Sequence, residues 1–234
     1  MSDYLKAITE ILGRIESEET AKLSAAAEAV AETICRDGII HTFGCGHSHL
    51  PTLDTFYRAG GLACTSPILD EDLMLHNGAA KSSRMEKMSG IAAEAFRRAC
   101  VDPKKDLIVV ISASGKNAAP VEMCECAKVA GVRLVTISSS AYVDHGARLL
   151  SLGDIAIDCK VPYGDAVIDV GDKKMGGLST YASLFILNTI LIEGAKKALA
   201  KGAQPPIYTS GNVAGGTAKN VALEERYFAR VKNL

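Results

Sequence analysis

Apolar residues recur every three or four positions over the first part of the chain, in a pattern that places them on one side of an α-helix. The clearest set is Leu5, Ile8, Ile11, Leu12 and Ile15. No glycine lies between Gly13 and Gly38 to interrupt the pattern. We therefore predict a long leading helix, or a pair of helices, over residues 3–35.

A short apolar run at 39–43 has the length and the β-branched residues of a buried strand. The glycines of Gly44-Cys45-Gly46 end it, and Pro51 then suits the first turn of a helix, where its missing N–H costs nothing. The order strand, glycine loop, helix is thus predicted for residues 39 to about 55.

The same order recurs later in the chain. The run 107–111 opens into the loop 112–117, and a helix is predicted from 118 to 130. Gly131 suits the end of that helix, and 132–137 is the next predicted strand.

The remaining pattern predicts a strand at 62–66, a helix at 84–100, a strand at 154–158, an irregular stretch at 164–177, an apolar helix at 178–201 and a closing helix at 218–232. Strands that alternate with helices in this way are typical of a mostly parallel sheet with helices on both faces, a three-layer α/β/α sandwich. No linker or internal repeat divides the chain. We predict a single domain over 1–234, with a helical N-terminal extension at 1–35, a core at 36–202 and a C-terminal tail and helix at 203–234.

Composition narrows the choice of partners. The 234 residues carry a net charge of −1 and are 48% hydrophobic, so a sizeable core is expected and no basic field is available to gather nucleic acid or an anionic membrane. The longest apolar stretch, 182–192, is too short to span a membrane. Seven scattered cysteines and the lack of a signal peptide at the start of the chain lead us to expect a cytoplasmic protein.

The two loops that follow the strands have the composition of phosphate-binding loops, because glycine allows close approach and serine hydroxyls donate to phosphate oxygens. Turn formation and helix capping would explain the same residues. A dinucleotide fingerprint is not present, since His49 stands at its third glycine, and Val110 stands at the first glycine of a P-loop. We expect a small phosphorylated ligand and no cofactor.

The loops Phe43-Gly44-Cys45-Gly46-His47-Ser48 and Ile111-Ser112-Ala113-Ser114-Gly115-Lys116-Asn117, with Glu122 beyond, resemble the sugar isomerase (SIS) domain family. Segments 58–62, 86–90 and 210–216 are similar to its branch near the phosphoheptose isomerases and the N-acetylmuramic acid 6-phosphate etherases. The resemblance implies a flavodoxin-like sheet, a phosphosugar ligand, and a homodimer or homotetramer. Asn117 stands where the family has threonine, which keeps a polar helix cap but removes one hydroxyl.

The resemblance and the loops together give the predicted site. Residues predicted to bind the phosphate are Gly46, His47, Ser48, Ser112, Ser114, Gly115 and Asn117. Glu86 takes the position of a catalytic glutamate in the etherase-like branch, and we predict it to be the base, at a helix start, with His49 and His76 as proton carriers. Arg58 and Glu122 are weaker predictions for substrate contacts, since either could serve only a helix end.

The predicted activity is a sugar-phosphate isomerase that removes a proton next to a carbonyl. The alternatives are a phosphosugar lyase or etherase, and a regulator that senses a phosphosugar without turnover. His47 and His49 also suggest a metal site, but no third ligand is fixed by the sequence, and we predict none.

Overall fold

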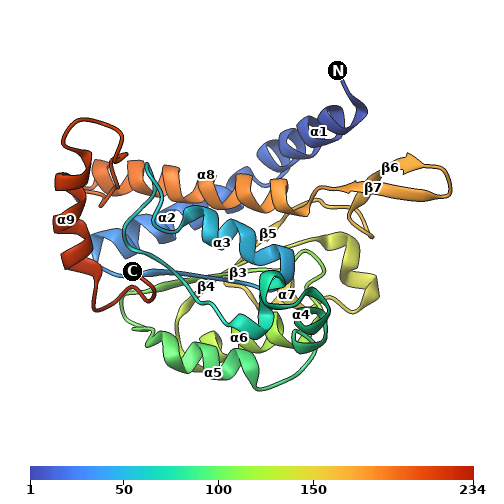
Figure 1. The fold of residues 1–234 in the computed structure, drawn as a ribbon, viewed down its shortest axis with the longest axis horizontal. Coiled ribbons are helices and arrows are strands. Elements are labelled where there is room, and N and C mark those ends of the chain that lie inside the picture. Colours follow the sequence, from blue (N-terminus) through green and yellow to red (C-terminus); the bar gives the residue numbers. More distant parts are fainter.

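A five-stranded, wholly parallel sheet runs through the middle of the computed structural model, which describes all 234 residues (Figure 1). The strand order is β2-β1-β3-β4-β5. The strands are β1 Ile40–Gly44, β2 Thr65–Pro67, β3 Leu107–Ile111, β4 Arg133–Ser138 and β5 Ile155–Asp158. The predicted α/β architecture is confirmed.

Helices cover both faces of this sheet (Figure 1). The longer helices are α1 Asp3–Glu18, α2 Thr20–Cys35, α5 Ile91–Ala99, α6 Ala118–Ala130, α8 Ser179–Ala200 and α9 Gly216–Tyr227. The shorter ones are α3 Leu50–Thr55, α4 Ala79–Met85 and α7 Leu149–Leu152. Single 3-10 turns are η1 Gly46–His49, η2 Glu71–Leu73, η3 Leu75–Asn77 and η4 Ser140–His145.

The central strand shows why the core has two halves. Leu107, Val109 and Ile111 point to one face and pack with residues of α1, α2 and α8, whereas Ile108 and Val110 point to the other and pack with α5 and α6. Side chains alternate along a strand, so a continuous apolar run buries both faces at once. All five residues of β3 are buried, which explains why apolar content alone predicted the strand correctly.

The leading segment is a pair of helices, as the second of the two alternatives predicted. The break falls at Glu19, between α1 and α2, and the side chain of Glu19 is buried there. No helix of the structure is both long and apolar enough to cross a membrane.

The helix predicted over 84–100 is wrong as a single element. The chain forms α4, which ends at Met85 with Glu86 as its C-cap, and starts α5 at Ile91. Gly90 separates the two with a φ of 98°, a left-handed conformation that favours glycine. Glu86 therefore lies at the end of a helix and not at the start of one.

The stretch 164–177 was predicted to be irregular and instead forms an antiparallel hairpin of β6 Ala166–Val170 and β7 Lys173–Gly177. The hairpin projects from the body on the same side as α1 (Figure 1). Its base is held by the hydroxyl of Tyr4, which donates to the carbonyl of Gly177 at 2.8 Å. A contact with a distant helix thus stabilises strands that are only partly buried.

Candidate functional site

Two loops leave adjacent strands at the same edge of the sheet. Gly44 of β1 is paired with Ile111 of β3, so the β1 loop (residues 45–49) and the β3 loop (residues 112–117) begin side by side. Ligands of parallel α/β sheets bind beyond the carboxyl ends of the strands. The β1 loop contains Gly46, His47 and Ser48, and the β3 loop contains Ser112, Ser114, Gly115 and Asn117. The residues predicted to bind phosphate therefore share one edge.

The β3 loop is a tight turn held by its own groups. The amide N–H of Gly115 donates to Ser112 Oγ at 3.1 Å, and Gly115 has a φ of 58°. A Cβ at this position would overlap Ser138 Oγ, so the turn requires glycine. Ser48 and Ser114 are half-buried, and neither hydroxyl is used by a hydrogen bond within the chain, which leaves both free for a ligand.

A third loop joins this edge and was not predicted as part of the site. In the β4 loop (residues 139–148), the N–H of Ser139 donates to the carbonyl of Ala113 at 3.0 Å, and Ser138 Oγ donates to the same oxygen at 3.3 Å. Ala113 lies between the two predicted phosphate serines. The serine run 138–140 after a strand was the available signal in the sequence.

Glu86 reaches the β3 loop from the end of α4. Asn117 Nδ2 donates to Glu86 Oε1 at 2.9 Å, and the N–H of Ala119 donates to the Glu86 carbonyl at 2.9 Å. The side chain of Asn117 thus does not cap α6, contrary to prediction. It ties the predicted base to the predicted phosphate loop.

The environment of Glu86 favours its neutral form. The residue is half-buried, and burial raises the pKa of its carboxyl group, while the positive charge of Lys87 opposes the shift. Burial also raises the pKa of the Cys45 thiol, and the negative charge of Glu86 adds to that effect. Both effects favour the protonated thiol over the more reactive thiolate.

Two of the predicted histidines lie close together. The rings of His49 and His76 are 6.0 Å apart between centroids, with His49 buried and His76 exposed. His49 Nδ1 contacts the carbonyl oxygen of Gly46, which fixes the orientation of the ring. His47 is exposed. No group of three or more His, Cys, Asp or Glu side chains is arranged to hold a metal ion.

Arg58 lies outside this cluster. Its guanidinium pairs with Asp54 one helical turn earlier, and it lines a 480 Å³ cavity against α8 to which neither loop contributes.

Glu122 already has partners in the fold. Its carboxylate accepts the N–H groups of Gly90, Ala92 and Ala93, at 2.7 to 3.1 Å, and so caps α5. The sequence suggested that it stabilises its own helix, whereas it caps a neighbouring one. No signal in the local sequence reveals that contact.

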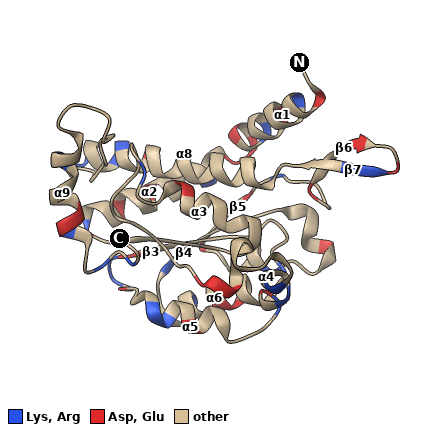
Figure 2. Cartoon of the chain, in the orientation of Figure 1, with Lys and Arg blue, Asp and Glu red and all other residues tan.

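Unpaired positive charge lies beside Asn117. Asn117 lines a 420 Å³ cavity together with Lys87 and Lys116, and neither lysine forms an ion pair. Helix α4, in the same part of the molecule (Figure 2), carries Arg84, which forms no ion pair, and Lys81, which is paired with Asp72. Although the whole chain has a net charge of −1, this edge carries positive charge that can attract an anion.

Comparisons with known proteins identify the family of this chain. The family model described as SIS domain matches residues 3–139. A UPF0309 protein of Caldanaerobacter subterraneus subsp. tengcongensis is 38% identical over 243 residues, which cover 99% of this chain and 98% of that protein.

Two solved structures show the same fold. A phosphoheptose isomerase from Neisseria gonorrhoeae is 14% identical with a TM-score of 0.55, covering 82% of this chain and 95% of that one. The sugar isomerase domain of a transcription factor from Sphaerobacter thermophilus is 15% identical with a TM-score of 0.50, and the match covers 97% of this chain and 94% of that one. The family model and the relative that aligns over 99% of the chain together show that this protein belongs to the SIS-domain family and is a UPF0309 homologue.

Proposed function

We propose that this protein binds a phosphorylated sugar and isomerises it by removing a proton next to the carbonyl. The observation that carries the proposal is the hydrogen bond between Glu86 and Asn117, because it places a half-buried carboxylate against the loop that suits a phosphate. A base and an anchor for the substrate are the two parts that this chemistry needs.

In the proposed reaction, the Ser48 and Ser114 hydroxyls and the N–H of Ala118, the first residue of α6, hold the phosphate. The Glu86 carboxylate takes the proton from the carbon next to the carbonyl, and the electron pair left behind forms the double bond of an enediol. His49 or His76 supplies a proton to the sugar oxygen. The same histidine then takes the proton from the hydroxyl on the carbon that was deprotonated, so that this oxygen becomes the new carbonyl. Return of the first proton from Glu86 to the neighbouring carbon completes the exchange of aldehyde and ketone.

The first test is a thermal-shift comparison of sugar phosphates with the same sugars lacking phosphate, followed by proton exchange at C2 in heavy water. A ligand present at 100 times its Kd adds about 2.7 kcal/mol of stability. Stabilisation by phosphorylated sugars with exchange supports the isomerase. Binding without exchange would instead indicate a sensor, and no stabilisation by any sugar phosphate would remove the proposal.

Replacing Ser114 with alanine is expected to weaken sugar-phosphate binding about 10- to 150-fold, because a hydrogen bond to a charged group contributes about 1.5–3 kcal/mol. Isothermal titration gives the affinity directly. Ser17→Ala is the matched control, since Ser17 lies on α1 and its hydroxyl bonds only within that helix. Equal affinity in both variants would place the phosphate elsewhere.

The pH profile of the exchange reaction should reflect the environment of Glu86. A base must be ionised, so the rate should rise with pH through a pKa above the usual glutamate value. Lys87→Gln removes a positive charge that lowers this pKa, and the acidic limb should move to higher pH. Lys104→Gln, at the opposite edge of the sheet, should leave the limb in place. An unmoved limb in Lys87→Gln would show that another group titrates.

A further inference from the structure

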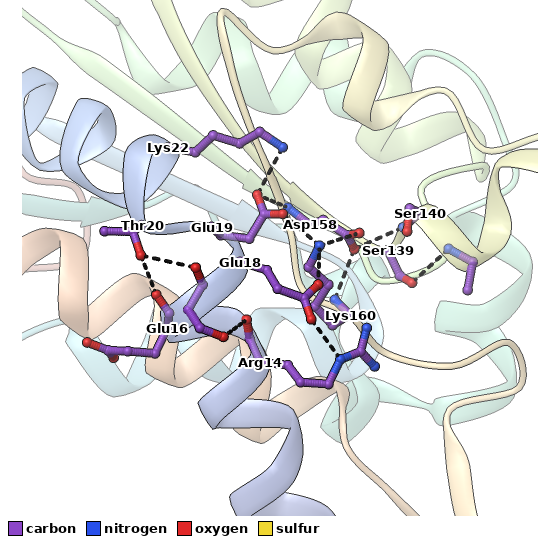
Figure 3. Close-up of polar contacts among 12 residues, drawn as sticks. Arg14, Glu16, Glu18, Glu19, Thr20, Lys22, Ser139, Ser140, Asp158 and Lys160 are labelled. Carbon is purple, nitrogen blue, oxygen red and sulfur yellow. Dashed lines mark hydrogen bonds and ion pairs between the residues drawn. The ribbon is translucent and has the colours of Figure 1, made fainter.

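A buried ion cluster lies at the carboxyl end of β5, where the chain passes the junction of α1 and α2 (Figure 3). Lys160 Nζ lies 2.8 Å from Glu19 Oε1, 3.2 Å from Glu18 Oε2 and 3.3 Å from Asp158 Oδ2. The side chains of Lys160 and Glu19 are only 13% and 4% exposed. Lys160 also has a φ of 58°, which is uncommon for a residue with a side chain of this kind.

All members of the cluster are ionised at neutral pH. Burial opposes ionisation of Glu19 and Asp158, but hydrogen bonds from Lys160 to the first, and from Ser140 and the Lys160 N–H to the second, hold both pKa values below the usual range. Glu19 and Glu18 in turn raise the pKa of Lys160, against the effect of burial. The Lys160 ammonium thus has three carboxylate oxygens within 3.3 Å, and its charge is satisfied within the fold.

The β4 loop connects the cluster to the β3 loop by one hydrogen bond on each side. On the side of the cluster, Asp158 Oδ1 accepts the N–H of Ser140 at 3.0 Å, and it also accepts the N–H of Lys160 at 2.9 Å. The preceding residue, Ser139, donates its N–H to the carbonyl of Ala113, between Ser112 and Ser114. The β4 loop is therefore fixed on one side by the charged cluster and holds the β3 loop on the other.

We propose that Lys160 is a positioning residue for the phosphate site. It holds the Asp158 carboxylate in place, Asp158 holds the β4 loop, and the β4 loop sets the backbone of the β3 loop to the geometry that receives an anion. The inference rests on the proposed function, because it assigns a purpose to a loop that is itself proposed to bind phosphate. It also makes the α1–α2 junction, through Glu18 and Glu19, a support of the site.

The test uses the full-length ¹⁵N-labelled protein, with inorganic phosphate as the probe. Lys160→Met keeps the length and the burial of the side chain and removes only its charge. We expect the amide signals of Ala113, Ser114 and Gly115 to move, and the affinity for phosphate to fall about tenfold, as is usual when the support of a binding group is lost. The amide of Gly131, at the far end of α6, is the internal reference.

Lys22→Met is the matched control. Lys22 also pairs with Glu19, at 2.9 Å, but it is 51% exposed and does not contact Asp158. It should change neither the loop amides nor the affinity. A folded Lys160→Met protein with unmoved loop amides and unchanged phosphate affinity would overturn the proposal.

Two other outcomes are also decisive. If the wild-type protein binds no phosphate, the proposed function fails, while the loop amides of Lys160→Met still decide whether Lys160 positions the loop.

If Lys160→Met does not fold, Ser140→Pro replaces it. Ser140 is exposed at the first position of η4, where proline is tolerated, and the change removes both the N–H and the hydroxyl through which Ser140 interacts with Asp158. The same shifts support the proposal, and their absence overturns it.

Discussion

Replacing Glu86 with glutamine is expected to lower the rate of C2-proton exchange by about 10²–10⁴-fold, the usual contribution of a general base. Glutamine has nearly the same size and keeps an oxygen that accepts from Asn117 Nδ2. The loop geometry, and with it the binding of sugar phosphate, should therefore persist. The rate is measured by the loss of the C2 proton signal in heavy water, and binding by thermal shift.

Glu225→Gln is the control for this variant, because Glu225 is an exposed glutamate on α9. It should retain both rate and binding. Full activity in Glu86→Gln would mean that the base is a different group, and His49 and His76 would be the next residues to replace. Loss of binding together with rate would mean that the carboxylate has a structural role in the loop.

Replacing Asp106 with alanine is expected to lower the free energy of unfolding by about 2–6 kcal/mol, because two buried groups each lose a hydrogen-bond partner at a cost of about 1–3 kcal/mol. The Asp106 carboxylate accepts the N–H of Ile39 at 2.7 Å and that of Asp102 at 2.8 Å. It also contacts His41 Nε2 at 3.1 Å, with His41 2% exposed. The N–H of Ile39 and the ring of His41 are buried and would lose this partner without access to water, whereas Asp102 is exposed and its N–H can turn to solvent. Urea unfolding measures the loss.

Asp102→Ala is the control, since the side chain of Asp102 is exposed and bonds only the N–H of Lys104. Its cost should stay below about 1 kcal/mol.

Burial opposes ionisation of Asp106, but His41 and the N–H groups of Ile39 and Asp102 hold its pKa below the usual range. The stabilisation is thus complete above the usual aspartate pKa and is lost as the pH falls through the lower folded value. A difference between wild type and Asp106→Ala that did not narrow in acid would contradict this.

The sequence predicted best where local signals agree. The strand Leu107–Ile111 and the helix Ala118–Ala130 have the predicted bounds, because a buried apolar run, a glycine and serine turn and the αL residue Gly131 all mark the same limits. The two loops were found for the same reason, since strand ends and helix starts are local features. Parallel pairing of β1 with β3 then brought them together.

Distant contacts account for what was missed. The break between α4 and α5 depends on Glu122, whose carboxylate caps α5 from a different helix. The strand predicted at 62–66 is observed only at Thr65–Pro67, and Leu62 instead forms an isolated β-bridge with Ile207. The closing helix ends at Tyr227 and not at 232. The Glu86–Asn117 and Lys160–Glu19 contacts join residues far apart in sequence, and neither has a periodic or turn signal.

The order of the strands bears on how this chain folds. β3, α6 and β4 follow one another directly, so they form a compact unit with little loss of chain entropy. β1 reaches β3 only after residues 45–106 have closed a long loop. The β1 and β3 loops therefore come together at the step that joins these two parts, and an intermediate that contains only the unit from β3 to β4 has one of the two loops of the proposed phosphate site.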